Sequence, residues 1–161
     1  MSDGAATDFS WQHDACWRPN DTMALFISSA KFENDLMPEA QGVAPKVDVP
    51  ARQVWLQTSY RHLNYVKSGS RGNVDVLLNG NILVGWGHSA AYTQYTPDGT
   101  SVISNMHFGR FTLFSFRVTN SYRVFQRVFG WKNRVQIPLQ LWIDGRCLSV
   151  GMVQQKLLVG A

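Results

Sequence analysis

Residues 72–87 read GNVDVLLNGNILVGWG, and this stretch decides the fold. Two runs rich in Val, Ile and Leu are separated by Asn79-Gly80. An Asn-Gly pair between β-rich runs predicts a tight hairpin, because both central residues of a type I′ turn have positive φ. The aliphatic content favours strands that are packed on both faces. Trp86 stands between two glycines, which indicates a bulge or a close approach of the backbone.

The residues that follow this hairpin predict two more strands. They are 90–96 (AAYTQYT) and 101–108 (SVISNMHF), and the turn sequence Pro-Asp-Gly-Thr at 97–100 separates them. Proline presets φ in such a turn, and glycine takes positive φ without strain. Four consecutive strands correspond to one complete blade of a β-propeller. We expect Trp86 to pack in the core between such blades.

Other segments also have strand or loop patterns. A strand, a turn and a second strand are predicted over 13–26, another strand over 52–60, and further strands over 111–118 and 122–129. The three prolines in 28–50 predict a long irregular loop or insertion. No segment has a long apolar period of 3.6 residues with helix caps, so the sequence predicts a nearly all-β chain.

The hairpin pattern occurs three times. Its turns are Asn20-Asp21, Asn79-Gly80 and Asp144-Gly145, separated by 59 and then 65 residues. When the first two copies are aligned at their turns, Trp17 corresponds to Val76 and Met23 to Ile82. Repeats built around a hairpin are typical of propellers and similar β arrays. Three weak copies can also arise in any hairpin-rich protein, so the repeat alone leaves both interpretations open.

Composition restricts the class of protein. The chain has 161 residues, of which 45% are hydrophobic and 16% are charged, as expected for one globular domain. The net charge of +4 comes without a Lys/Arg block, which argues against nucleic acid as a partner. Neither an apolar run long enough to span a membrane nor a signal region is visible, and the compartment stays open.

Two cysteines, Cys16 and Cys147, form no metal-binding pattern and no CxxC motif. They are compatible with one disulfide or with two buried thiols, and we favour the thiols. The sequence shows no other metal-ligand spacing, so neither a metal nor a cofactor is predicted. The oligomeric state is not predicted either.

Four motifs resemble those of the arylsulfotransferase (ASST) family, in the same order. They are HDACWRPNDTMALF at 13–26, GNVDVLLNGNILVGWG at 72–87, YTPDGT at 95–100 and NSYRVFQRVFGW at 120–131. The chain is most similar to the fungal and actinobacterial branch. The resemblance implies a six-bladed β-propeller, of which this chain would supply only a part. It implies two to three blades over residues 1–131 and a short C-terminal β segment over 132–161, the remnant of a β-sandwich.

The resemblance also implies a reaction. Characterised bacterial members transfer a sulfuryl group from an aryl sulfate to a phenol, through a histidine and without a nucleotide sulfate donor. That histidine must be neutral to attack sulfur. The sulfate oxygens need cationic or N–H donors, and an acid or base must exchange a proton with the phenol oxygen. Aryl sulfates and phenols are therefore the expected small-molecule partners.

His13 is the residue that best matches the histidine of the family, because it opens the His-Asp-Ala motif at a strand entry. Asp14 follows it and is expected to orient either His13 or a neighbouring residue. Adjacent residues of a regular strand point to opposite faces, which argues against direct support of His13 by Asp14.

The remaining candidates would contact the substrate. Arg123 of the Ser-Tyr-Arg motif is predicted to clamp the sulfate, and Tyr122 to contact the phenol. Asn73 lies at the matching entry of the next repeat, where its amide could donate to an oxyanion. His88 directly follows Gly-Trp-Gly, departs from the family pattern and is a further candidate for substrate binding.

Each candidate also has a structural interpretation. His13 could be an ordinary histidine at a strand end, Arg123 a surface residue, and Asn73 a turn residue. His62 and His107 have no sequence neighbours that suggest chemistry. At the level of the whole chain, the alternatives to a sulfotransferase are a non-catalytic propeller that binds a ligand and an inactive fragment with open sheet edges.

Overall fold

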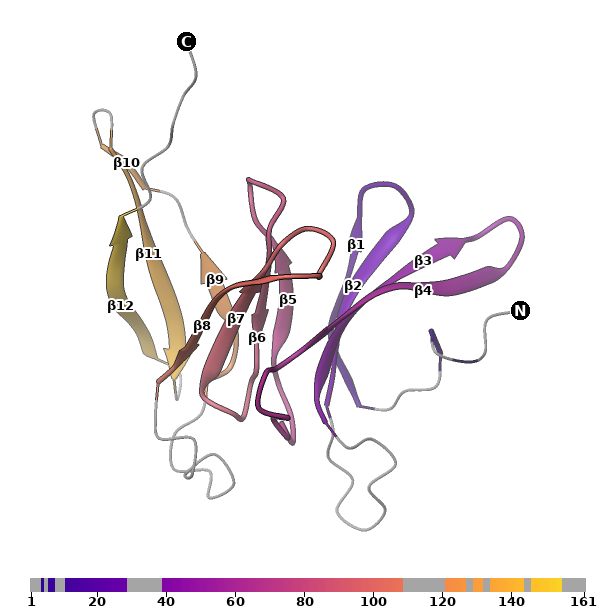
Figure 1. Cartoon of the computed structure of the whole chain (residues 1–161), viewed down its shortest axis with the longest axis horizontal. Coiled ribbons are helices and arrows are strands. Elements are labelled where there is room, and N and C mark those ends of the chain that lie inside the picture. The colour runs from indigo at the N-terminus through magenta and orange to yellow at the C-terminus, as the bar shows by residue number, and fades with distance from the viewer. Residues whose placement is uncertain are drawn as a thin grey trace.

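The computed structural model describes residues 4, 6–7, 11–28, 39–108 and 121–126 with their side chains, and the backbone of 129–131, 134–143 and 146–154. All regular structure in these residues is β-strand. The strands form three antiparallel sheets that lie side by side, with the second sheet between the other two (Figure 1). The predicted all-β fold class is therefore confirmed.

The first sheet is a four-stranded meander in the order β1-β2-β3-β4. Asn20 and Asp21 both have positive φ, 61° and 55°, and they turn the chain between the first two strands. Asn and Asp tolerate this left-handed region better than other side chains do. The strands are β1 (Gln12–Arg18), β2 (Thr22–Ile27), β3 (Gln41–Asp48) and β4 (Gln53–Arg61).

The irregular loop predicted over 28–50 is wrong for residues 41–48, which form β3. This strand is paired on both sides, with β2 and with β4. The ladder with β4 shifts its register between Ala44 and Pro45. A bulge tolerates a residue without an N–H, so the proline is accommodated there without ending the strand. Residues 29–38 lie outside the described part of the chain.

The second sheet is the predicted blade, in the order β5-β6-β7-β8. Its first hairpin is confirmed, but the predicted type I′ turn is wrong, because only Gly80 has positive φ. The Gly80 N–H bonds to the Leu77 carbonyl, and the Leu77 N–H to the Asn81 carbonyl. A turn followed by a left-handed glycine is the usual longer hairpin loop. The strands are β5 (Asn73–Val76), β6 (Ile82–Gly85), β7 (Ala91–Tyr95) and β8 (Val102–His107).

The first two sheets share the predicted repeat. Trp17 faces Met23 across the first hairpin, and Val76 faces Ile82 across the second, as the overlay of the two copies requires. The third predicted hairpin also exists, because Ile143 pairs with Arg146 on either side of its turn. The turn itself lies outside the described residues.

The third sheet contains the last four strands. β9 and β10 both pair with β11, which pairs with β12 on its other side. The third hairpin therefore joins the last two strands of its sheet, whereas the other two hairpins join the first two. This sheet runs across the boundary predicted at 131/132, and the division into two domains stays a prediction. The strands are β9 (Val124–Gln126), β10 (Phe129–Trp131), β11 (Arg134–Ile143) and β12 (Arg146–Gln154).

Two further sequence predictions fall near this sheet. The strand predicted over 122–129 begins later, at Val124. The strand predicted over 111–118 lies outside the described residues.

In the part of the chain that the structure covers, no helix is long and apolar enough to cross a membrane. Cys16 is a half-buried free thiol, and the side chain of Cys147 is not described.

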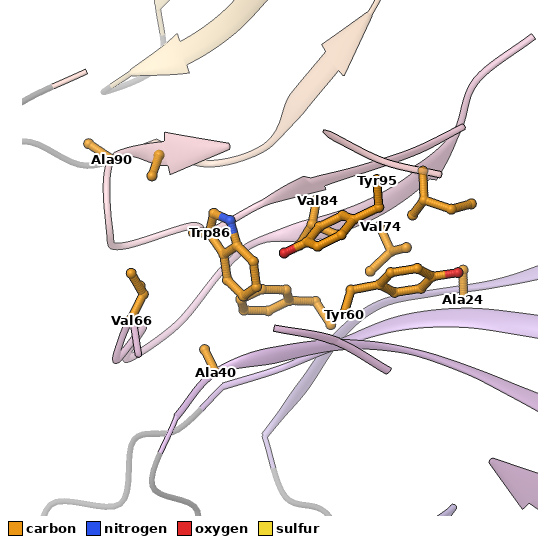
Figure 2. Packing of buried hydrophobic residues seen from close by; sticks show 12 residues of the cluster. Ala24, Ala40, Tyr60, Val66, Val74, Val84, Trp86, Ala90 and Tyr95 are labelled. Atoms are coloured by element: carbon orange, nitrogen blue, oxygen red, sulfur yellow. The ribbon is translucent and has the colours of Figure 1, made fainter. Parts of the chain in front are cut away.

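The main core lies between the first two sheets (Figure 2). Trp86 is fully buried there, as predicted, and meets the Phe26 ring edge-on at a centroid distance of 5.9 Å. Tyr60 of β4 lies against Tyr95 of β7, with centroids 5.4 Å apart. The opposite face of the second sheet packs on Val124, which anchors the start of β9. The second sheet thus packs against the first sheet with one face and against the start of β9 with the other.

Gly42 on β3 marks a close approach of the first two sheets. A Cβ placed there would lie 2.8 Å from Val74 Cγ2 and 3.3 Å from Val84 Cγ2. Gly42→Ala should therefore lower the free energy of unfolding by about 1–3 kcal/mol through overpacking, measured by urea denaturation. Gly80→Asn is the control, because a Cβ there would make only an ordinary contact of 3.6 Å with Pro97 Cγ and asparagine tolerates positive φ. Equal losses in the two variants would contradict this account.

Candidate active site

The first strands of the three sheets all begin at the same end of the molecule. Asn73, the first residue of β5, hydrogen-bonds to Val124, the first residue of β9. Asp14, near the start of β1, forms an ion pair with Arg123, which directly precedes β9. Side chains from distant parts of the sequence therefore meet at this end.

A β-bulge in β1 includes Asp14, the partner of Arg123 in this ion pair. The register between β1 and β2 shifts between His13 and Cys16, and Asp14 within the shift has a φ of 54°. A bulge breaks the strict alternation of side chains along a strand. Asp14 Oδ1 lies 3.1 Å from Arg123 Nη2. Of the two partners that the sequence left open for Asp14, this contact corresponds to a neighbouring residue, Arg123, and not to His13.

His13 lies within the electrostatic reach of the same arginine. Burial lowers the pKa of His13, and the positive charge of Arg123 lowers it further. Both effects favour the neutral imidazole, because each makes the added proton less stable. The Nε2 atom is buried and makes no hydrogen bond with the described residues. A neutral imidazole with an uncommitted nitrogen is the form that nucleophilic attack requires.

Tyr122 and two arginines form a cationic surface beside this histidine. The guanidinium carbons of Arg123 and Arg71 lie 5.5 Å and 5.7 Å from the centre of the Tyr122 ring. The ring is 52% exposed. Such cation–π contacts hold guanidinium groups in place without neutralising their charge. The sequence analysis missed Arg71, and its place directly before the deciding stretch was the only signal.

Asn73 is fully buried, and its amide is bonded to the backbone of β9. Its Nδ2 donates to the Val124 carbonyl at 2.7 Å, and its Oδ1 accepts from the Val124 N–H at 2.8 Å. The amide thus reproduces the paired hydrogen bonds of a neighbouring strand. The predicted contact between Asn73 and a substrate anion stays a prediction.

His88 lies in the connection between β6 and β7, at the same end of the second sheet. Its N–H donates to the Ser70 carbonyl at 3.1 Å, and its Nδ1 lies 3.1 Å from Ser70 Oγ. These bonds place it beside the residues that lead into β5. The carbonyl of Gly87 accepts a hydrogen bond from the Ser121 N–H, which connects this loop to the chain before Arg123.

Buried His62 and half-buried His107 lie against each other, and the sequence suggested no chemistry for either of them. The His62 and His107 rings are 5.1 Å apart, and His62 also meets the Trp86 ring at 5.3 Å. Burial, followed by the charge of His107, lowers the pKa of His62 to about 4. The two histidines are distant in the sequence and meet only through sheet packing, so no local signal could have found the pair.

Metal ligands do not gather in the described residues. They contain no group of three or more His, Cys, Asp or Glu side chains that could hold an ion. The side chains at the first-strand end are an imidazole whose pKa is lowered, a carboxylate paired with a guanidinium, and a second guanidinium against a tyrosine ring.

The fold and the site define an all-β protein of four-stranded antiparallel meanders, with a histidine, an aspartate and arginines gathered where the first strands begin. The model of the arylsulfotransferase (ASST) family matches residues 2–109, about two thirds of the chain, and the chain belongs to this family. The match includes His13, Asn73 and His88 and ends before Tyr122. Searches among curated proteins and solved structures found no match.

Proposed function

We propose that this chain acts in the transfer of a sulfuryl group from an aryl sulfate to a phenol, with His13 as the acceptor and Arg123 as the sulfate clamp. Membership in the arylsulfotransferase family supports small aryl compounds as substrates. The observation that carries the residue assignment is the meeting of His13, Asp14 and Arg123 at one end of the sheets, with the Asp14–Arg123 ion pair at 3.1 Å.

The first half-reaction moves the sulfuryl group to the protein. A nitrogen lone pair of neutral His13 attacks sulfur, and the bond from sulfur to the aryl oxygen breaks. The aryloxide takes the electron pair of that bond and then a proton, which releases a phenol. Arg123, held by Asp14, donates hydrogen bonds to the sulfate oxygens and stabilises the charge that develops on them.

The second half-reaction returns the histidine to its starting state. An acceptor phenol loses its proton to a base, its oxygen attacks sulfur, and the bond from sulfur to His13 breaks. Tyr122 is exposed enough to contact the aromatic ring of either phenol. His88, on the loop next to Ser121, is the candidate group for proton exchange or substrate contact at the edge of this site.

We further propose that the sheets are blades of a partial β-propeller over residues 1–131, followed by a β-sandwich remnant over 132–161. Two complete four-stranded meanders packed face to face support this architecture. The open edges of a partial ring favour association, so size-exclusion chromatography with thermal melting is the matching measurement. A monodisperse species with one sharp transition supports a self-contained core, and aggregated material supports the inactive-fragment alternative.

Removing the acceptor should abolish the reaction. His13→Ala is expected to lose at least about 10³-fold in aryl sulfate turnover with a phenol acceptor, because no other group carries the sulfuryl intermediate. Arg123→Ala should lose about 10²–10³-fold, as for the loss of one oxyanion donor. The assay follows phenol release from a chromogenic aryl sulfate in the full chain.

The control is Arg52→Ala, which removes an exposed arginine from the turn between β3 and β4. That turn lies at the opposite end of the first sheet, because β4 ends beside the start of β3. Arg52→Ala should leave turnover unchanged. Turnover that survives in His13→Ala overturns the proposed acceptor. Saturable binding of an aryl sulfate without any turnover points instead to a non-catalytic binding module.

A further inference from the structure

The chain segment that carries Arg123 is tied to the second sheet along its whole length. Five hydrogen bonds connect the two, at distances between 2.7 and 3.1 Å. They are made across a sequence separation of up to 51 residues. The bonds join Asn73 on the sheet, and Gly72 and Gly87 next to it, to Ser121, Tyr122 and Val124 on the segment.

Asn73 contributes two of these five bonds, and both come from its side chain. Both ends of its amide are bonded to Val124, one residue after Arg123. The backbone around it also makes room for this contact. A Cβ at Gly85 would lie 2.5 Å from Asn73 Oδ1 and 3.0 Å from Val124 Cγ2. The glycine therefore leaves space that the amide and Val124 fill.

The position of Val124 fixes the position of Arg123. Val124 is fully buried against the second sheet, so its backbone has little freedom once the amide of Asn73 holds it. The adjacent residue then emerges at a defined point, where Asp14 meets its guanidinium at 3.1 Å. The bonds from Asn73 to Val124 measure 2.7 and 2.8 Å, and the contact between Asp14 and Arg123 measures 3.1 Å. Asn73 and Val124 are fully buried.

We infer that Asn73 is a positioning residue, which places the Arg123 guanidinium at His13 by holding the backbone of Val124. The catalytic consequence of this placement rests on the proposed function, but the placement itself does not. The inference assigns Asn73 a role in the protein's own geometry, whereas the motif alone suggested direct contact with a substrate.

The placement can be measured through His13. In the wild type, the charge of Arg123 lowers the pKa of His13, so its pKa reports where the guanidinium lies. We expect Arg123→Gln to raise the His13 pKa, followed by NMR titration of its ring protons and assigned with His13→Gln. Asn73→Ala should raise it in the same direction. The double variant should show no more change than Arg123→Gln alone.

The control variant is Tyr95→Phe, which removes a partly buried hydrogen bond between a side chain and the backbone, from the Tyr95 hydroxyl to the Arg61 carbonyl. It should lower stability without moving the His13 pKa. An unchanged His13 pKa in Asn73→Ala, while Arg123→Gln moves it, would overturn the inference and leave Asn73 with a structural role. An unchanged pKa in Arg123→Gln would overturn it as well.

A second measurement covers the case in which Asn73→Ala does not fold. In the wild type, the side-chain amide protons of Asn73 should exchange with solvent far more slowly than those of the exposed Asn79. Equal exchange rates would overturn the inference. Activity then separates the two proposals. If neither the wild type nor any variant transfers sulfate, but the His13 pKa responds as expected, the proposed function fails and the positioning role stands.

Discussion

Replacing Trp86 by alanine is expected to lower the free energy of unfolding by about 3–5 kcal/mol. The indole is fully buried, contacts the Phe26 and His62 rings, and lies where the two complete sheets meet. Its Nε1 also donates to Thr93 Oγ1 at 2.9 Å, and the variant leaves that buried hydroxyl without its donor. Urea denaturation followed by circular dichroism measures the loss.

The matched control is Trp17→Ala on β1, where the indole is 60% exposed. Surface substitutions usually change stability by about 0.5 kcal/mol or less, so this variant should unfold close to the wild type. If both variants lose the same stability, the Trp86 side chain is not the centre of the core between the first two sheets.

The second large effect is a loss of stability in mild acid. His62 has a pKa of about 4 in the folded protein, against 6.5 without its surroundings. Above pH 6.5 both states hold it neutral, and its full contribution to stability is present. Below that pH only the unfolded state binds the proton, so stability falls until the pH reaches the folded pKa. The expected loss is about 2 kcal/mol at about pH 5 relative to about pH 7.5.

The variant His62→Gln isolates this contribution, because glutamine does not titrate. Its unfolding free energy should depend less on pH over the same range. The pKa values of His13 and His107 are also lowered, mainly by burial, and they add to the acid loss in both proteins. Urea denaturation of wild type and variant at both pH values gives the difference. Parallel pH curves would show that His62 gains its proton without unfolding the core.

Local turn chemistry made the hairpins predictable. Asn20-Asp21 and Asn79-Gly80 mark real turns, because the left-handed backbone at Asn20, Asp21 and Gly80 is set by residue type and needs no distant contact. The same local reasoning failed for β3. Pro45 indicated a loop, but pairing with β2 and β4 on both sides stabilises the strand around a bulge. Tertiary pairing outweighed a local signal there.

The geometry around Asp14 could not be predicted from the sequence. The family motifs suggested His13 and Arg123, and strand alternation argued only against support of His13 by Asp14. A bulge with positive φ at Asp14 breaks that alternation where Asp14 pairs with Arg123, and nothing in the local sequence signals the bulge. Arg71 and the His62–His107 pair were missed because only the packing of distant segments brings them to their partners.

The amide of Asn73 also bears on the order in which the protein assembles. Val124 is 51 residues further along the chain, and closing so long a loop costs entropy that local hairpins do not incur. The first two sheets can therefore form before the segment that carries Arg123 docks. Until that segment docks, His13 lacks its neighbouring cation and Asp14 lacks its partner. The proposed site would thus be completed late in folding, and a chain that stops short of residue 123 would contain His13 without Arg123.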